Sequence, residues 1–91
     1  MTKFEWDPRK AQLNLRKHRV SFEEATTVFR DLLSATALDP DHSIREHRFV
    51  TLGMSSAGKL LTIFHAERGE SIRIISARNA TKQERKIYEE G

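Results

Sequence analysis

The chain has 91 residues, enough for one small hydrophobic core and too few for a second independent one. Lys and Arg number 16 against 13 Asp and Glu, a formal net charge of +3, and the absence of cysteine excludes disulfides, thiolate metal sites and cysteine nucleophiles. No apolar run reaches the roughly 18 residues of a membrane span, and no signal-peptide core is present. We therefore expect one cytoplasmic domain over residues 1–91 that does not act at a membrane.

The charges are unevenly distributed along the chain. Residues 1–20 carry six bases and two acids, whereas residues 21–42 carry five acids and only one base, Arg30. The basic segment from Arg9 to Arg19 could attract phosphate or an acidic partner. A solvated helix face would have the same composition, so charge alone leaves both interpretations open.

The N-terminal part of the sequence predicts a short strand followed by two helices. Weak alternation over residues 2–6 is typical of a strand. Asp7 then provides an N-cap in front of a proline, which predicts a helix from Pro8 to about His18. Ser21 and Glu24 form a capping-box pattern that starts a second helix. The buried side of this helix is expected to contain Phe22, Ala25, Val28 and Phe29.

The second part of the sequence predicts strands with short connections. The predicted order is a short apolar segment, a turn, three strands and a helix: Leu33–Leu38, Asp39–Asp41, Arg45–Gly53, Leu60–Ala66, Ser71–Ala77 and Thr81 to about Glu90. Connections this short favour antiparallel hairpins. The fold class is therefore α+β, with two N-terminal helices, an antiparallel sheet of about four strands and a short C-terminal helix.

Motifs for metal or nucleotide chemistry are missing from the sequence. His42 and His47 lie five residues apart, but no third ligand has a suitable spacing. No glycine-rich phosphate loop occurs. We expect neither a metal nor a cofactor.

Arginine side chains gather late in the sequence. Arg73 interrupts an isoleucine-rich strand, Arg78 ends that strand, and Arg68 lies in the connection before it. Arg85 and Tyr88 are three residues apart on the terminal helix and share a side. We expect these side chains to converge on one patch, although Arg73 could instead pair with Glu67 or with a helix carboxylate.

Such a patch suits the cleavage of RNA. Attack by a 2′-hydroxyl needs removal of a proton, stabilisation of charge on the phosphorane and protonation of the departing oxygen. Arginines supply the charge stabilisation but are poor bases. His65, Glu67 and Tyr88 are the candidates for proton transfer, and Arg68, Lys59 and Lys82 are candidates for substrate binding.

Two blocks of the sequence resemble the BrnT toxin family. The first runs from Phe4 to Ala25 and includes Phe4-Glu5-Trp6-Asp7-Pro8 and Lys17-His18-x-Val20-Ser21-Phe22. The second includes Glu67-Arg68-Gly69, Ile72-Arg73-Ile74-Ile75-Ser76-Ala77-Arg78 and Glu84-Arg85-x-x-Tyr88. The combination is specific because the two blocks together span nearly the whole chain. One departure is Arg19, which stands where glycine is usual between the helices.

The resemblance implies a RelE-like fold and the toxin half of a bacterial type II toxin–antitoxin pair. It implies a ribonuclease that inhibits translation, with the family's arginines at Arg68, Arg73, Arg78 and Arg85 and Tyr88 beside them. Because the sequence has no metal motif, we expect cleavage without a metal, with Arg73, Arg78, Arg85 and Tyr88 as catalytic candidates. The implied partners are RNA and a cognate BrnA-type antitoxin, and promoter DNA is bound only by the toxin–antitoxin complex.

Two other functions compete with this reading. A non-catalytic module could use the same basic surface only to hold an antitoxin or a nucleic acid. Direct DNA binding by the chain itself is less favoured because no helix-turn-helix spacing is present.

Overall fold

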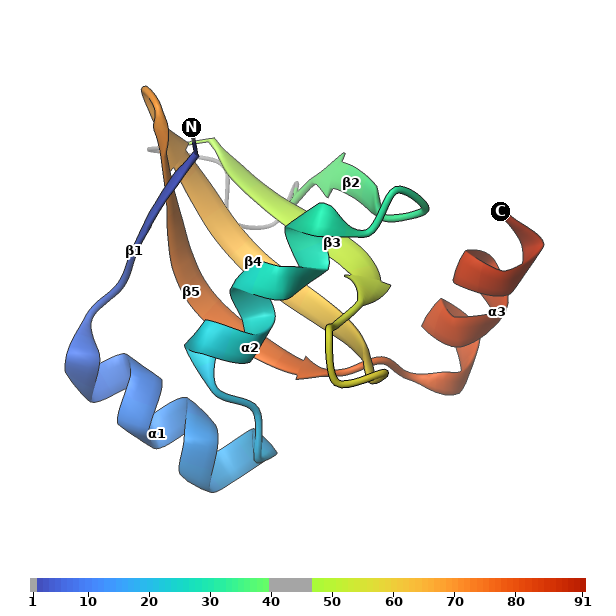
Figure 1. Cartoon of the computed structure of the whole chain (residues 1–91), viewed down its shortest axis with the longest axis horizontal. Helices are drawn as coiled ribbons and strands as arrows, with labels where there is room; N and C mark the ends of the chain where they lie inside the picture. Colours follow the sequence, from blue (N-terminus) through green and yellow to red (C-terminus); the bar gives the residue numbers. More distant parts are fainter. Residues whose placement is uncertain (1, 40–46) are drawn as a thin grey trace.

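The computed structural model describes residues 2–39 and 47–91, which form an α+β fold (Figure 1). Its elements are β1 (Lys3–Glu5), α1 (Pro8–His18), α2 (Phe22–Thr27), a 3₁₀ turn η1 (Val28–Arg30), β2 (Ala35–Leu38), β3 (Arg48–Met54), β4 (Leu60–Arg68), β5 (Ser71–Asn79) and α3 (Lys82–Glu90). The predicted fold class and the two N-terminal helices are confirmed. Residues 40–46, which include part of the predicted turn and the start of the predicted third strand, lie outside the described ranges. Within those ranges, every helix is too short or too polar to cross a membrane.

The prediction of about four antiparallel strands was correct only in part, because a fifth strand is present and one of the pairs is parallel. The sheet has five strands in the order β1-β5-β4-β3-β2. β1 pairs in parallel with β5, where Phe4 lies opposite Ile72, whereas the other neighbours are antiparallel. The antiparallel pairs follow from the short connections. β1 and β5 are separated by most of the chain, so no hairpin constrains their direction.

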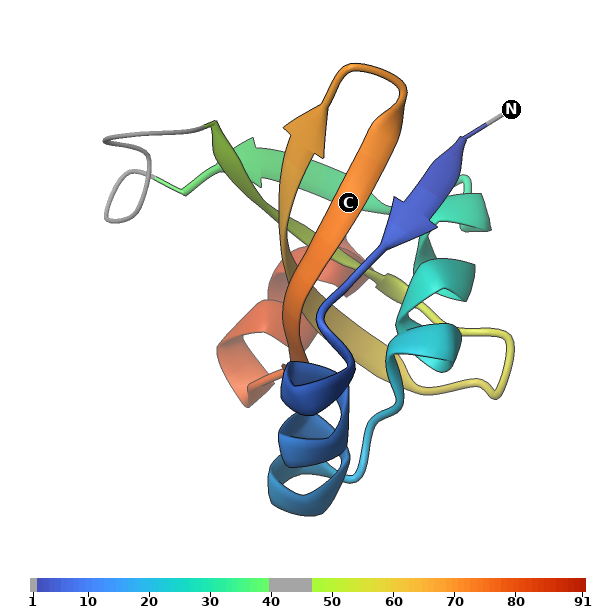
Figure 2. The ribbon, with the colours of Figure 1, turned by 90° about the vertical axis from the view of Figure 1, so that its left-hand side faces the viewer.

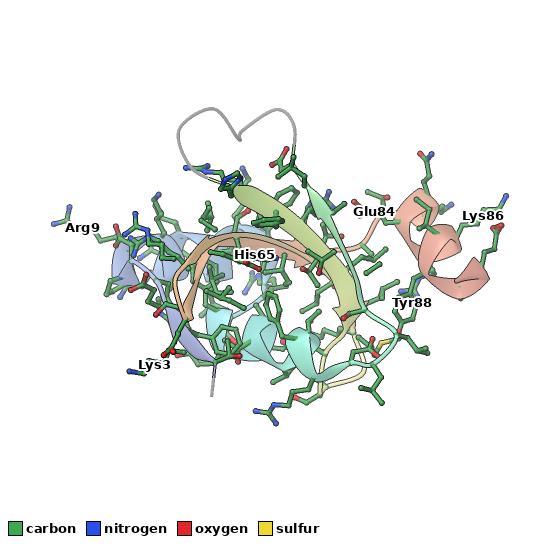
Figure 3. The ribbon with its side chains drawn as sticks, turned by 90° about the horizontal axis from the view of Figure 1, so that it is seen from above. Lys3, Arg9, His65, Glu84, Lys86 and Tyr88 are labelled. Carbon is green, nitrogen blue, oxygen red and sulfur yellow. The ribbon has the colours of Figure 1, made fainter. Side chains whose placement is uncertain are left out.

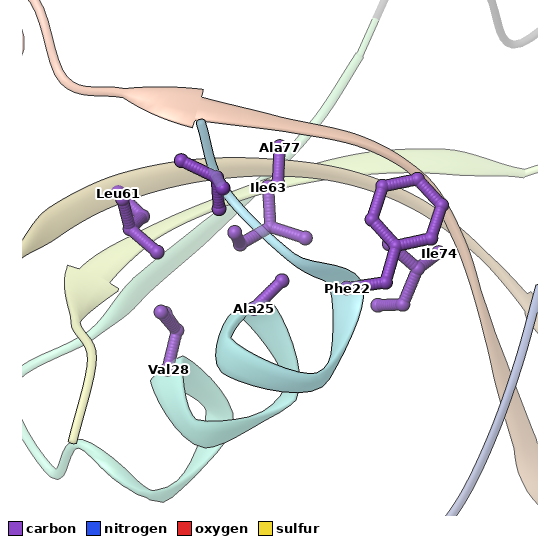
Figure 4. Packing of buried hydrophobic residues seen from close by; sticks show 8 residues of the cluster. Phe22, Ala25, Val28, Leu61, Ile63, Ile74 and Ala77 are labelled. Carbon is purple, nitrogen blue, oxygen red and sulfur yellow. The ribbon is translucent and has the colours of Figure 1, made fainter. Parts of the chain in front are cut away.

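Helix α2 and the turn η1 cover one face of the sheet and bury the core there (Figure 4), and Ala11 of α1 packs against this core. The cluster consists of Val20, Phe22, Ala25, Val28, Leu61, Ile63, Ile74 and Ala77, each at most 1% exposed. Most of the predicted buried side of the second helix is confirmed, while Phe29 is only partly buried. We call this side of the sheet the helix-covered face.

The side chain of Asn14 fixes α1 to β5. Its amide nitrogen donates to the carbonyl oxygens of Val20, at 2.9 Å, and Ala77, at 2.8 Å, and its oxygen accepts from the Ala77 N–H at 3.0 Å. All three bonds are buried, so losing the amide would leave several backbone groups without partners. The position of α1 is thereby tied to the residue that directly precedes Arg78.

Candidate functional site

Four arginines lie on the sheet face opposite the helix-covered face. Strand register shows this, because residues paired across neighbouring strands project from the same side. Arg48 and Arg73 are both paired with Ala66, Arg78 is paired with Thr62, and Arg68 lies two residues after Ala66 on β4. We call the side of the sheet that carries Arg48, Arg68, Arg73 and Arg78 the arginine face.

An irregularity in β5 brings Arg73 and Arg78 to the same side. In a regular strand, residues five positions apart point to opposite faces. Here the register between β4 and β5 shifts at Phe64 and His65, so that one extra residue, Ile75, is inserted in β5. Such bulges recur near functional sites, where they redirect side chains. The bulge therefore places both guanidinium groups on the same face of the sheet.

Arg78 and Glu84 form a bidentate ion pair at the end of the arginine face. The two guanidinium nitrogens of Arg78 donate to the two oxygens of Glu84 at 2.7 and 3.0 Å, and the Thr62 hydroxyl donates to Glu84 at 2.9 Å. The bond from Arg78 lowers the pKa of Glu84 to about 2, helped by the Thr81 N–H and the Thr62 hydroxyl. The same pairing raises the pKa of Arg78. Glu84 is thus ionised at neutral pH.

The aromatic ring of Phe64 lies under Arg78 and borders a small pocket. The Arg78 guanidinium carbon is 5.5 Å from the ring centroid, a cation–π distance. The pocket has a volume of about 250 Å³ and is lined by Asp39, Arg48, Phe49, Phe64, His65, Ile75 and Ser76. The pocket lining holds one cation, Arg48, and one anion, Asp39. Cations beside aromatic rings, as with Arg78 over Phe64, suit a phosphate and an attached base.

Arg73 is the cation of this face that is most available to a ligand. It is partly exposed, and within residues 2–39 and 47–91 its side chain forms no hydrogen bond or ion pair. The predicted alternative, pairing with Glu67, does not occur. Glu67 is paired with Ile72, so it projects from the helix-covered face.

His65 also projects from the helix-covered face. Its side chain is 1% exposed, and its Nε2 lies 2.7 Å from the Thr51 hydroxyl, which in turn lies 2.7 Å from the Thr36 hydroxyl. Burial lowers the pKa of His65 to about 4. The ring packs edge-on against Phe29. The structure therefore does not bring His65 or Glu67 to the predicted arginine patch, and their proton-transfer roles stay predictions.

The remaining predicted site residues are Tyr88 and four exposed cations. The Tyr88 hydroxyl donates to Asp31 at 2.5 Å, and this bond raises the pKa of Tyr88 and lowers that of Asp31. Figure 3 shows Tyr88 and Glu84 on α3 at one end of the sheet. The other candidates, Arg68, Arg85, Lys59 and Lys82, are exposed.

Sequence reasoning missed three contributors to this site. Glu84 was identified only as part of a capping box, which the structure confirms through the Thr81 hydroxyl and N–H. Its ion pair with Arg78 could have been suspected from the six-residue spacing between the two. Phe64 and Arg48 could have been found only by pairing each strand with its neighbours in the correct register.

A metal centre was not expected, and the described residues offer no ligand set for one. Within residues 2–39 and 47–91, no three His, Asp or Glu side chains gather closely enough to hold an ion. His42, one of the two histidines considered from the sequence, lies outside those ranges.

Comparisons with known proteins agree with this fold. The family model described as the ribonuclease toxin BrnT of type II toxin–antitoxin systems matches residues 6–84. The crystal structure of the Brucella abortus ribonuclease toxin BrnT superposes with a TM-score of 0.67 and 24% identity, covering 90% of this chain and 100% of that one. The comparison with curated protein sequences found no match. From the match over residues 6–84, the chain belongs to the BrnT family of ribonuclease toxins of type II toxin–antitoxin systems.

Proposed function

We propose that the chain is a metal-independent endoribonuclease whose scissile phosphate binds on the arginine face. The observation that carries this proposal is the shared orientation of Arg73 and Arg78, with an ionised Glu84 beside Arg78. Family membership supports RNA as the target. Guanidinium groups stay charged and match the geometry of phosphate oxygens.

In the proposed reaction the 2′-oxygen attacks the adjacent phosphorus, the O2′–P bond forms and the P–O5′ bond breaks. Arg73 and Arg78 stabilise the additional negative charge of the phosphorane. Glu84 accepts the proton of the 2′-hydroxyl. A phosphate that takes over the N–H groups of Arg78 would remove the largest cause of the low pKa of Glu84, so substrate binding itself makes this carboxylate a better base.

The departing 5′-oxygen requires a proton, and we assign its delivery to Tyr88. Tyr88 lies four residues after Glu84, one turn along the same side of α3. Its raised pKa keeps the hydroxyl protonated in the resting protein. Donation to the substrate requires the hydroxyl to leave Asp31.

In the cell, the proposal places the chain in the cytoplasm as a RelE-like toxin that inhibits translation. A cognate BrnA-type antitoxin would neutralise it, and only the complex of the two would bind their promoter DNA. An antitoxin partner is implied by family membership. Expression of the chain alone should arrest bacterial growth, whereas a non-catalytic binding module should not.

The direct test is cleavage of an RNA oligonucleotide by the purified chain, with both product ends mapped. The expected products carry a 2′,3′-cyclic phosphate and a 5′-hydroxyl. The Arg78→Ala variant should cleave about 10²–10³-fold more slowly, as when a preorganised charge donor is removed. Products with 5′-phosphates, or undiminished cleavage by a folded Arg78→Ala variant, would contradict the mechanism.

A further inference from the structure

The exposed side of α1 carries an unusual concentration of positive charge. Arg9, Lys10, Arg16, Lys17 and, at the C-cap, Arg19 are all exposed, and α1 itself contains no acidic residue. Within the described parts of the chain, none of these five side chains forms an ion pair. The arginine face does not include them, so the proposed mechanism leaves their charge unused.

Helix geometry groups the cations of α1 into one surface. At about 100° per residue, Arg9 and Arg16 project within about 20° of each other, and so do Lys10 and Lys17. The two pairs occupy an arc of about 120°, and the members of each pair are about 10.5 Å apart along the axis. Leu13, which is 62% exposed, lies between them. We call this surface, together with Arg19, the α1 basic surface.

Three of these cations lie where folding stability disfavours them. Arg9 and Lys10 occupy the first turn of α1, where the helix dipole repels positive charge. Arg19 has a φ of 60°, a left-handed conformation that favours glycine and costs other residues about 1–2 kcal/mol. Folding therefore explains neither the cations of Arg9 and Lys10 nor a residue other than glycine at position 19.

The α1 basic surface is held in a fixed position relative to the arginine face. The three buried bonds of Asn14 attach α1 to Ala77, and the next residue along β5 is Arg78. Figure 2 shows α1 at the end of the sheet, with α2 and α3 on opposite sides. Figure 3 places Arg9 and Glu84 far apart, so a strand in contact with both would span several nucleotides.

We propose that the α1 basic surface binds the phosphate backbone of RNA outside the cleaved nucleotides, an inference that rests on the proposed function. A repeated anionic backbone matches cations spread over three turns of a helix. The surface also begins beside the strand that carries Arg73 and Arg78. An acidic polypeptide is the competing ligand, and the test below separates the two.

The first experiment measures binding of a non-cleavable single-stranded DNA of about 20 nucleotides, longer than the roughly 4–16 nucleotides that a small domain covers. Arg9→Gln/Lys10→Gln is compared with Lys3→Gln/Arg30→Gln, which also removes one Arg and one Lys, both exposed and outside α1. Each lost phosphate contact reduces the slope of log K against log salt by about 0.7 for a single strand. The α1 double variant should therefore lose about 1.4 of slope, and the control should keep the parent slope.

The second experiment uses Arg19→Gly, which separates binding from stability. Glycine relieves the left-handed backbone strain, so the free energy of unfolding should rise by about 0.5–1 kcal/mol. Binding should nevertheless weaken, with the slope reduced by about 0.7. A merely structural Arg19 would leave the salt slope unchanged.

These readouts keep the two proposals apart. If the parent cleaves RNA and the α1 variants bind the long strand with the parent slope, the α1 proposal is wrong and the proposed function stands. If no RNA is cleaved, a reduced slope in the α1 variants still supports the surface. Unchanged DNA binding combined with lost binding of polyglutamate would overturn the α1 proposal and assign the surface to an acidic protein.

Discussion

The two faces of the sheet divide stability from chemistry. On the helix-covered face, Phe22, Ile63 and Ile74 are almost completely buried, and even the titratable side chain of His65 is only 1% exposed. On the arginine face, Arg73 is partly exposed, and Arg78 has a side-chain exposure of 32%. Strand alternation separates the two sets, and a single bulge adds Arg78 to the same side as Arg73. Variants on the helix-covered face should therefore change the free energy of unfolding, and variants on the arginine face should change the rate of RNA cleavage.

Glu84→Gln is expected to have the largest effect on the arginine face. Glutamine keeps the capping box and can accept from Thr62, so α3 should remain folded. It cannot accept the proton of the 2′-hydroxyl, and loss of general-base catalysis typically reduces the rate by about 10²–10⁴-fold. Single-turnover cleavage measures this, with Glu89→Gln, an exposed neighbour on α3, as control. Equal rates for parent and Glu84→Gln would remove Glu84 from the mechanism.

Phe22→Ala should act on the stability of the fold and not on the chemistry of cleavage. Truncation of a fully buried phenylalanine costs about 3–5 kcal/mol of unfolding free energy, measured by urea denaturation. Because that loss could unfold a small domain, Ile63→Val provides a milder companion with an expected loss of about 0.5–1.5 kcal/mol. The cleavage rate of the folded Ile63→Val variant should stay within about twofold of the parent, as expected for uncoupled sites. A tenfold loss of rate would show that the two faces are coupled.

His65→Phe tests whether the histidine belongs to the helix-covered face in function as well as in position. Burial lowers the folded-state pKa to about 4 from an ordinary value of 6.5, so the unfolded chain takes up its proton first as the pH falls. This group therefore contributes stability above about pH 6.5 that is lost towards pH 4, and the loss between about pH 7 and pH 5 is on the order of 2 kcal/mol.

Urea unfolding at pH 7 and at pH 5 measures this loss of stability. The loss should appear in the parent and in the control His47→Gln, whose histidine is exposed, and it should be absent from His65→Phe. Cleavage by His65→Phe should continue at the parent rate. A collapse of the rate in a folded His65→Phe variant would restore the role predicted for His65 from the sequence.

Local patterns were sufficient to predict the helices but not the complete sheet. Ser21 and Thr81 both cap helices as predicted, because capping depends on residues only three positions apart. The parallel pairing of β1 with β5 depends on contacts across about 70 residues, which no local pattern specifies.

The candidate site was predicted in part for the same reason. The sequence identifies Arg73 and Arg78 as candidates, and the structure places both on one face. Strict alternation would have separated them, and the bulge at Ile75 has no glycine to mark it in the sequence. The position of His65 could not be predicted, because alternation within β4 does not say which alternate residues face the helices.

The most direct test of the central claim compares Arg73→Ala with Arg30→Ala at a saturating concentration of RNA. Both arginines lack an ion pair within the described residues, but Arg30 lies in η1, on the side of the helices. Single-turnover cleavage should fall by about 10²–10³-fold in Arg73→Ala and remain at the parent rate in Arg30→Ala. Equal rates in the two folded variants would mean that RNA is not cleaved on the arginine face.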